Sequence, residues 1–362
     1  MKDRIVIAMS GGVDSSLTAA ILKERGYDVI GVAMRIWDYP EEMDDSLSSC
    51  CSQRDIDDAR CVAEKLKIPF YVLNLKDEFK KKVVDYFVSE YMIGRTPNPC
   101  IVCNQKLKFG ILMKRASDLN ASLVATGHYA EVVKDNNSMR YTIKRGIDKR
   151  KDQSYFLFNL TQDQLKRIVL PLGRYLKSEV RELARRYGLK TSEKRESQEI
   201  CFILDNNYPS FIQKMVGNER IVKGDIVNRE GKILSTHKGI PFYTIGQRRG
   251  ISISSAKPLY VIQLDAINNR IVVGEENDLK KREFYVEDVN WCLIPSERDS
   301  FDAMVQIRYK HSPAEASIIP IGEDKVKVEF KEAQRAITPG QAAVFYRGDL
   351  LIGGGWIKGD LV

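Results

Sequence analysis

The sequence predicts an α/β fold, in which a doubly wound, mainly parallel sheet is followed by a small central β-rich domain and a C-terminal antiparallel β-barrel. In the first third of the chain, short apolar runs alternate with amphipathic stretches of helical length, the pattern of a parallel sheet with helices on both faces. From about residue 224 the pattern changes to short alternating β runs separated by Gly and Asn turns, which is typical of small barrels. We therefore expect three domains, at residues 1–205, 206–281 and 282–362.

Composition limits the class of protein. The 362 residues are 43% hydrophobic and 29% charged, as in a globular protein long enough to bury more than one core. No apolar run approaches the length that spans a bilayer, and the N-terminal run from Ile5 to Met9 is too short for a signal peptide. We expect a cytoplasmic protein with no membrane association. The odd number of cysteines, seven, favours reduced thiols over a disulfide scaffold.

The first structural unit predicted is a strand, a glycine turn and a helix. Ile5 to Met9 is an apolar run, Ser10-Gly-Gly12 is a tight turn, and a helix is expected from Asp14 onwards. The glycines allow a ligand close to the backbone, and the N–H groups that begin the helix favour an anion. The turn is not a Walker loop, because it lacks the G-x-x-x-x-G-K-[ST] pattern, and we expect no lysine to hold a γ-phosphate. Such a turn suits attack at an α-phosphate, with pyrophosphate leaving and an adenylate as product.

The rest of the sheet follows the same alternation. Further strands are expected at 29–34, 70–75 and 123–126, helices at about 55–66, 78–91 and 107–116, and a long loop at 38–54. Ligands of such sheets bind at the carboxyl ends of the strands. Ser10, Met34 and Gly127 are all expected at such ends, and therefore around one site.

The second half of the chain is expected to be mostly β. We expect a hairpin at 131–145 that turns at 135–138, helical stretches at 154–159 and 178–187, and β runs at 225–228, 259–264, 270–273, 304–309, 326–330, 343–346 and 351–356. No helix follows Gly353-Gly-Gly355, so we interpret these glycines as close backbone packing and not as a nucleotide turn.

Positive charge is concentrated in one segment. The net charge is +8, and residues 140–195 contain 16 Lys and Arg against 6 Asp and Glu, so the remainder of the chain is close to neutral. Such a basic segment suits a polyanionic partner bound through its phosphates. A solvated charged surface is the alternative.

A second informative stretch contains thiols. Thr96-Pro-Asn-Pro99 precedes Cys100 and Cys103, and the two prolines predict a stiff, extended loop that presents both cysteines. Cys201 follows, just beyond the basic segment. Taken alone, the C-x-x-C spacing also fits a structural or zinc-related role.

Two family resemblances follow from these motifs. Ser10-Gly-Gly-Val-Asp-Ser-Ser16 resembles the signature of the ATP pyrophosphatases, or PP-loop proteins, which include GMP, NAD and argininosuccinate synthetases and several tRNA-modifying enzymes. The whole set resembles the tRNA-specific 2-thiouridylases, which replace the C2 oxygen of the wobble uridine with sulfur. The further motifs that match are Cys50-Cys-Ser52 before Asp57-Asp-Ala-Arg60, Thr96–Pro99 with Cys103-Asn104, Ala125–Ala130, Lys151–Leu157, Ile200–Ile203, Thr244–Gly250 and Arg308-Tyr309.

The resemblance implies roles for individual residues. It implies that ATP is bound by Ala8, Met9, Ser10, Gly11, Gly12, Val13, Asp14, Ser15, Met34 and Gly127, and that Cys103 and Cys201 are the catalytic cysteines. Asn98, Pro99 and Cys100 would lie against the target base, and His128, Lys151, Asp152, Gln153, Arg308, Tyr309 and Gln341 would contact tRNA. For His128 an internal hydrogen bond is the alternative. We expect Asp14 to help position Mg²⁺.

The implied partners are tRNA, bound through its anticodon stem-loop with help from the barrel, and a sulfur donor. The donor would be a cysteine desulfurase, a sulfur-relay protein or inorganic sulfide. Adenylation of the uridine oxygen would supply a leaving group, and sulfur would then displace AMP. In the family's usual account, sulfur arrives as a persulfide on Cys201, and Cys103 assists by forming a transient disulfide.

The chain departs from the family at Cys100, where many members have an Asp that is assigned acid or base work. A thiol, with a reference pKa of about 8.5, is mostly protonated at neutral pH and cannot simply inherit that role. One hypothesis is that Cys100, Cys103 and Cys201 bind a [4Fe-4S] cluster whose open iron holds hydrosulfide. Zinc is the rival metal, and it would need a fourth ligand.

Two other functions compete with 2-thiolation. One is another PP-loop tRNA thiolase or an adenylating synthetase, although a synthetase for a small metabolite would not need the basic segment. The other is a tRNA-binding protein with a degenerate nucleotide site. The intact Ser10, Asp14 and Ser15 argue against that second alternative.

Overall fold

The computed structural model describes residues 2–38, 52–194, 200–203, 207–251, 253–295 and 299–359. Cys50 and Cys51, the expected boundary at 205/206 and the end of the basic segment at Arg195 lie outside these ranges. In the ranges described, none of the helices has both the length and the apolar content needed to cross a bilayer.

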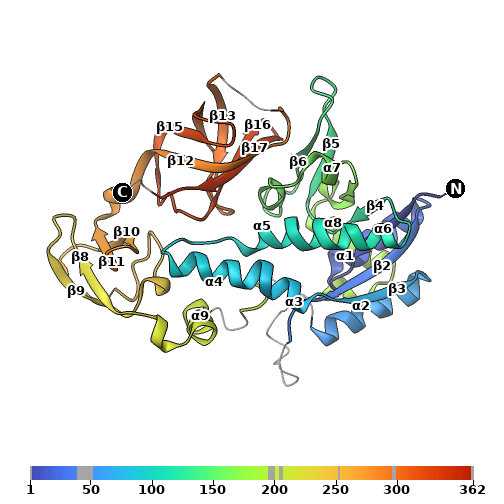
Figure 1. Ribbon diagram of the computed structural model, residues 1–362. Helices are drawn as coiled ribbons and strands as arrows, with labels where there is room; N and C mark the ends of the chain where they lie inside the picture. Colours follow the sequence, from blue (N-terminus) through green and yellow to red (C-terminus); the bar gives the residue numbers. More distant parts are fainter. Residues whose placement is uncertain are drawn as a thin grey trace.

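The N-terminal region is built on a five-stranded parallel sheet (Figure 1). Its strands are β1 Arg4–Ala8, β2 Asp28–Arg35, β3 Phe70–Asn74, β4 Leu123–Ala125 and β7 Ile168–Val169, in the order β3-β2-β1-β4-β7. The strand order reverses at β1, which lies between β2 and β4. In such sheets the crevice for a ligand forms at this switch point, beyond the carboxyl ends of the strands.

Helices cover both faces of this sheet because its strands are apolar on both sides. On β1, Val6 and Ala8 pack into one core, whereas Ile5, Ile7 and Met9 pack into the core on the opposite face. This arrangement explains why β1 is a continuous apolar run and does not alternate with polar residues. The predicted doubly wound α/β fold is confirmed.

The helices that accompany the sheet include three, at 53–66, 76–92 and 99–118, that begin earlier than the sequence predicts. The helices are α1 Val13–Glu24, α2 Gln53–Leu66, a continuous helix of α3 Lys76–Phe79, η1 Lys80–Val84 and α4 Asp85–Met92, a second continuous helix of α5 Pro99–Cys103, η2 Asn104–Ile111 and α6 Leu112–Asp118, then α7 Gln162–Leu165 and α8 Lys177–Arg186. The N-terminus of α2 is fixed by a reciprocal capping box, in which Ser52 N donates to Asp55 Oδ2 and Asp55 N donates to Ser52 Oγ. Short 3₁₀ helices are η3 Ser154–Leu157, η4 Pro171–Arg174 and η5 Lys190–Glu193.

A four-stranded sheet follows α9 Tyr208–Val216 and η6 Asn218–Arg220. Its strands are β8 Gly224–Val227, β9 Ile233–His237, β10 Tyr260–Asp265 and β11 Arg270–Gly274, with η7 Ile240–Phe242 between β9 and β10. This sheet has its own small apolar core, which includes Ile226, Val261 and Ile271. The prediction of a small β-rich unit in the middle of the chain is therefore correct.

The C-terminal strands close into a six-stranded antiparallel barrel, as predicted. After η8 Glu276–Leu279, the strands are β12 Lys280–Trp291, β13 Phe301–Gln306, β14 Ala314–Pro320, β15 Val326–Arg335, β16 Ala342–Arg347 and β17 Leu350–Ile357, and pairing of β12 with β17 closes the barrel. An ideal Cβ on Gly353 would lie 2.6 Å from Asn290 O, and one on Gly355 would lie 2.5 Å from Glu287 O. The glycine run is thus close strand packing, as expected.

The barrel is joined to the N-terminal region in a way that the sequence did not indicate. The predicted hairpin forms as β5 Ala130–Lys134 and β6 Tyr141–Arg145, and β6 pairs with β17, so the hairpin extends the barrel sheet (Figure 1). Arg140 at the start of β6 donates hydrogen bonds to the carbonyl oxygens of Trp291 and Cys292. Cys292 and Val344 of the barrel region also belong to the core that covers one face of the parallel sheet. The barrel and the first region therefore share a core.

Candidate active site

The phosphate turn lies directly after β1. Gly11 has φ +68°, and an ideal Cβ there would lie 2.1 Å from the carbonyl oxygen of Asp55 at the start of α2. Only glycine satisfies both constraints. Gly12 is the N-cap of α1 and makes no side-chain capping bond, so a ligand can approach the backbone N–H groups that begin this helix.

Hydroxyl groups hold the turn in shape. Ser10 N donates to Ser15 Oγ at 3.1 Å, and Ser15 Oγ donates to Gly12 O at 3.2 Å. Ser16 Oγ donates to the same Gly12 oxygen at 2.8 Å. Ser10 itself is exposed at the mouth of the turn, whereas Ala8, Met9, Val13 and Ser15 are buried behind it.

Two neighbouring strands bring further residues with predicted roles to this turn. An ideal Cβ on Gly127, just after β4, would lie 2.8 Å from Asp14 C and 2.9 Å from Ser15 N. On the other side, β1 pairs with β2 with Ala8 opposite Val32, which places Met34 at the same edge as Ser10. The structure therefore brings together the three strand ends that the sequence predicts to surround one site.

We predict that Gly127→Ala weakens ATP binding about tenfold or more. The added methyl group would push the β4 loop away from the first turn of α1, and overpacking of this kind typically costs about 1–3 kcal/mol. Isothermal titration with ATP measures the effect. Gly322→Ala is the matched control, because an ideal Cβ there meets only Lys325 Cβ at 3.8 Å. Equal ATP affinities for the two variants would contradict the packing of Gly127 on the phosphate turn.

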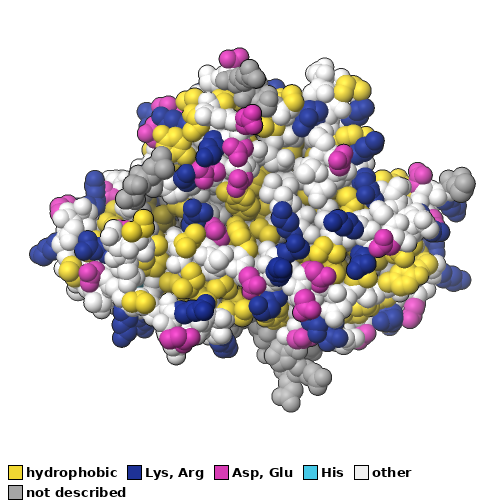
Figure 2. All heavy atoms as spheres, viewed as in Figure 1, with side chains coloured by type: hydrophobic (Ala, Val, Ile, Leu, Met, Phe, Trp, Pro, Cys, Tyr) yellow, Lys and Arg dark blue, Asp and Glu magenta, His cyan; other side chains and the backbone are white. Residues whose placement is uncertain are grey.

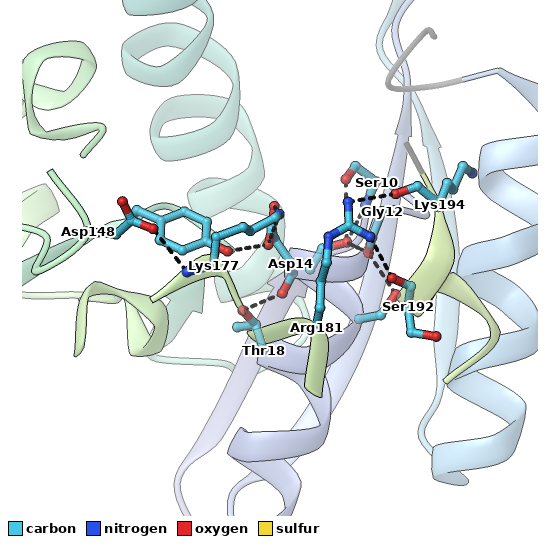
Figure 3. Close-up of polar contacts among 12 residues, drawn as sticks. Ser10, Gly12, Asp14, Thr18, Asp148, Lys177, Arg181, Ser192 and Lys194 are labelled. Carbon is cyan, nitrogen blue, oxygen red and sulfur yellow. Dashed lines mark hydrogen bonds and ion pairs between the residues drawn. The ribbon is translucent and has the colours of Figure 1, made fainter. Parts of the chain in front are cut away.

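Asp14, on the first turn of α1, has two partners that the sequence motifs do not reveal (Figure 3). Tyr129 Oη donates to Asp14 Oδ1 at 2.6 Å, and Lys177 Nζ lies 2.7 and 2.8 Å from the two carboxylate oxygens. The phosphate-turn motif itself contains no lysine, but packing of α8 against α1 brings Lys177 to Asp14 from 163 positions away. Local motifs cannot reveal such a partner.

Two more cations lie on the same side of the turn (Figure 3). Arg181, one turn along α8 from Lys177, donates to the carbonyl oxygens of Ser192 and Lys194 at 2.7 and 3.1 Å. Lys194 Nζ in turn binds Asp55 Oδ1 at 2.7 Å and also contacts Asp58. These bonds fix η5 and the start of α2 around the phosphate turn.

The thiol segment differs from its prediction. The chain is extended only to Asn98, and Pro99 begins a helix in which Asn98 Oδ1 caps the N–H of Ile101 at 3.4 Å. A proline at the first helical position loses no hydrogen bond, so the second proline starts a helix and does not continue an extended loop. Cys100 is exposed and Cys103 is half-buried on this first helical turn.

The segment that contains Cys201 is held by its neighbours in sequence. Phe202 is buried against Phe79, Phe87 and Phe211, with ring centroids 5.2–5.6 Å apart. Cys201 and Cys103 are both half-buried and pack against the same hydrophobic core. The structure therefore places the two thiols with predicted catalytic roles along one core.

The proposed metal ligands are not arranged as a metal site. Within the described ranges, which include Cys100, Cys103 and Cys201, no group of three or more His, Cys, Asp and Glu side chains is placed to hold a metal ion. Cys100 is exposed at the surface, whereas Cys201 borders the core beside Phe202. The arrangement of the described side chains therefore gives no support to a three-thiolate cluster, which stays a prediction.

Cys292 is a structural thiol. Burial raises its pKa to about 12, and its Sγ donates to Phe158 O at 3.4 Å. It lies where the barrel meets the first region, so we assign it no chemical role.

Several residues predicted to contact tRNA make internal contacts. His128 is only 8% exposed, its Nδ1 lies 2.6 Å from Thr126 Oγ1, and burial holds its pKa well below the ordinary value. Asp152 accepts hydrogen bonds from Gly146 N and Ser154, and Gln153 Oε1 accepts one from Tyr129 N. For His128 the arrangement favours the alternative, a neutral and internally bonded histidine, because its ring is buried and one ring nitrogen already bonds to Thr126.

The three predicted tRNA contacts in the barrel region also make contacts within the protein. Gln341 Nε2 donates to Thr96 O at 2.9 Å, just before the helix that carries Cys100 and Cys103. Tyr309 packs against Phe156 with ring centroids 4.4 Å apart, and Arg308 donates to Arg335 O at 3.0 Å. Gln341 therefore connects the barrel to the segment just before the thiol helix.

Several cations of the basic segment, residues 140–195, make contacts within the protein. Arg140 fastens the hairpin to the barrel, Arg145 lies 3.8 Å from the ring centroid of Tyr346, and Lys149 pairs with Asp349 at 2.7 Å. These three cations therefore have partners within the protein, although the pair of Lys149 with Asp349 is exposed at the surface. Figure 2 shows Lys and Arg side chains near the middle of one face, over the continuous helix of α5, η2 and α6 in Figure 1. Lys106 of η2 and Lys114 of α6 are exposed. The basic surface is thus not confined to the segment that the sequence singles out.

Three family models match the chain in succession. They are described as the tRNA methyl transferase HUP domain for residues 3–205, the tRNA methyl transferase PRC-barrel domain for 209–275 and the aminomethyltransferase β-barrel domain for 281–357. The first model alone covers more than half of the chain.

Curated relatives match over the full length. The tRNA-specific 2-thiouridylase MnmA of Carboxydothermus hydrogenoformans is 50% identical over 358 residues, which are 99% of this chain and 98% of the relative. The enzymes of the same name from Geotalea uraniireducens and Clostridioides difficile are 48% and 47% identical, over 99% and 100% of this chain and 95% and 99% of the relatives. A phosphate turn and a pair of thiols fit thiolation better than methyl transfer. On sequence, fold and site together, this chain belongs to the family of tRNA-specific 2-thiouridylases.

Proposed function

We propose that this chain replaces the C2 oxygen of the wobble uridine of tRNA with sulfur, using ATP. The observation that supports this most strongly is the combination, in one fold, of an adenylate-type phosphate turn with Cys103 and Cys201 along one core. A synthetase for a small metabolite would not need these thiols or the barrel beside them. A tRNA-binding protein would not need the intact turn.

The first step is adenylation of the uridine. The O2 atom attacks the α-phosphorus of ATP, the bond to the bridging oxygen breaks, pyrophosphate leaves with the electron pair, and the N3 proton is lost. The N–H groups at the start of α1 and the Ser10 hydroxyl would hold the phosphates. The carboxylate of Asp14, whose side chain is 31% exposed, fits a Mg²⁺ ion completed by phosphate oxygens. When bound, such an ion would neutralise negative charge on the phosphates.

The second step is sulfur transfer. The terminal sulfur of a Cys201 persulfide attacks C2, and AMP leaves with the former O2 atom. The Cys103 thiolate then attacks Cys201 Sγ, which releases 2-thiouridine and leaves a Cys103–Cys201 disulfide for an external thiol to reduce. This pairing is the one that the family resemblance implies, and both thiols are half-buried, not fully enclosed. No step is assigned to an iron–sulfur cluster, because the three thiols do not form a ligand set.

The target base would approach the start of α5. Asn98 caps this helix and is half-buried, and Cys100 is exposed on its first turn, so an unstacked base of an anticodon loop can reach Cys100. Gln341 and Tyr309 of the barrel lie beside this point, which supports a role for the barrel in holding the stem. The sulfur donor stays a prediction, namely a desulfurase, a relay protein or inorganic sulfide. A tRNA substrate also supports the predicted cytoplasmic location.

Mass spectrometry of nucleosides from bulk tRNA tests the proposed function. Cells that lack their own 2-thiouridylase should regain 2-thiouridine at the wobble position when this chain is expressed. Absence of 2-thiouridine, with the protein folded and abundant, would contradict the proposal.

We predict that neutralising Lys149, Arg150 and Lys151 together weakens tRNA binding and flattens its dependence on salt. Removing one ion pair between the protein and a phosphate lowers the slope of log K against log salt by about 0.9. Lys149 is expected to contribute least, because it already pairs with Asp349. Filter binding over a salt series measures the slope. The control variant neutralises Lys80, Lys81 and Lys82, three exposed lysines of η1, and an unchanged slope in the first variant would assign its charges to solvated surface.

A further inference from the structure

We propose that Lys177 is the residue that binds and neutralises the pyrophosphate leaving group. In this structure its ammonium group pairs with Asp14, and a Mg²⁺ ion held by that carboxylate would weaken the pair. The inference rests on the proposed function and adds a catalytic residue to it. Neither the phosphate-turn motif nor the residue roles implied by the family resemblance include this lysine.

Lys177 is held at the turn by three independent contacts. Its Nζ lies within 2.8 Å of both Asp14 oxygens, its backbone N donates to Asp148 Oδ2 at 3.0 Å, and Nζ lies 5.4 Å from the ring centroid of Tyr129 (Figure 3). The side chain is only 11% exposed. The ammonium group is therefore fixed beside Asp14 on the first turn of α1, the turn whose N–H groups are expected to face the phosphates.

The position of Lys177 is unfavourable for its own helix. It is the first residue of α8, where the helix dipole favours anions and disfavours a cation. Residues that break such a local rule are expected mainly at functional sites. Asp14 compensates for the charge in this structure, and phosphate oxygens would compensate equally well.

Arg181 provides a contrast on the same face of α8. Its guanidinium binds the carbonyl oxygens of Ser192 and Lys194, and these bonds brace the backbone of η5. Lys177 instead pairs with a carboxylate, which is a ligand that Mg²⁺ prefers. An ion held by Asp14 would compete with this ion pair, and the Lys177 ammonium group would then be available to another anion.

That anion is the pyrophosphate portion of ATP. As the bond between the α-phosphorus and its bridging oxygen breaks, negative charge builds on the leaving group. An ammonium group beside it stabilises this charge by hydrogen bonds, with no transfer of a proton. The α-phosphate stays with the nucleotide as AMP, so Lys177 should distinguish ATP from AMP.

The test is the ratio of ATP to AMP affinity, measured by isothermal titration on the full chain without tRNA. Lys177→Gln should weaken binding of ATP, and of inorganic pyrophosphate as a separate probe, by about tenfold to a hundredfold. The affinity for AMP should stay within about twofold. Lys177→Arg should recover part of the ATP affinity because it restores the charge.

Arg186→Gln is the matched control, because it removes a positive charge from the exposed side of the same helix, where Arg186 pairs with Glu182. Both affinities should be unchanged in this variant. Equal loss of ATP and AMP affinity in Lys177→Gln would show that Lys177 only shapes the turn, and no loss of either would show a structural ion pair, so either result overturns the inference. Failure of the unsubstituted chain to bind ATP would instead contradict the proposed function.

Discussion

Cys201→Ser is expected to abolish 2-thiouridine formation while tRNA-dependent release of pyrophosphate continues. Serine cannot bear a persulfide, whereas the phosphate turn that performs adenylation does not involve this side chain. We expect thiolation to fall at least about a thousandfold, because the sulfur carrier itself is lost. The fold should persist, since Phe202 and not Cys201 anchors the segment in the aromatic core.

Two assays on one reaction separate the steps. Pyrophosphate release is followed with a coupled assay, and 2-thiouridine is counted by mass spectrometry after nuclease digestion. Cys61→Ser is the matched control, because it makes the same change at an exposed cysteine of α2. Undiminished thiolation by the Cys201 variant would remove Cys201 from the mechanism.

Asp14→Asn is expected to stop the reaction one step earlier. The amide keeps an oxygen for the Tyr129 hydroxyl but has no charge for Mg²⁺ or for Lys177. Pyrophosphate release should fall about a hundredfold or more, as when an electrostatic contact to transferred phosphate is removed.

The fold of the Asp14 variant should survive, although Lys177 loses the carboxylate that balances its charge. Thermal unfolding checks this point. Asp57→Asn, at an exposed position of α2, is the control for removal of an aspartate charge. A folded Asp14 variant that releases pyrophosphate at the normal rate would rule out the assigned role of Asp14.

Local patterns in the sequence were enough to predict the core of the phosphate site. β1, the turn and α1 are contiguous, and their apolar run and glycines determine the local conformation. The ends of β2 and β4 could be added because parallel strands place their carboxyl ends at one edge. Gly127 therefore lies against Asp14, as the strand pattern implies.

Other features depend on packing that no local pattern encodes. Lys177 reaches Asp14 only because α8 packs on α1. The strand β7 has only two residues, and it is a strand because it pairs with β4. The hairpin was predicted, but its union with the barrel depends on pairing between Leu350 and Lys144, far apart in the chain.

The thiol segment was misjudged for a different reason. Proline fixes φ in a range that suits both an extended chain and the first position of a helix, so Thr96-Pro-Asn-Pro99 fitted two structures. In the structure Asn98 caps a helix that begins at Pro99, so the extended conformation ends there. That choice places Cys100 exposed on the first turn of the helix.

The fate of the uridine oxygen tests the central claim most directly. An anticodon stem-loop synthesised with ¹⁸O at C2 of the wobble uridine is incubated with the protein, ATP, Mg²⁺ and a persulfide donor. Mass spectrometry then measures the ¹⁸O content of the AMP, the pyrophosphate and the RNA. The account predicts one ¹⁸O atom in the AMP formed for each 2-thiouridine, and none in pyrophosphate. Unlabelled AMP accompanying labelled RNA that has gained sulfur, or ¹⁸O in pyrophosphate, would contradict activation of the uridine by adenylation.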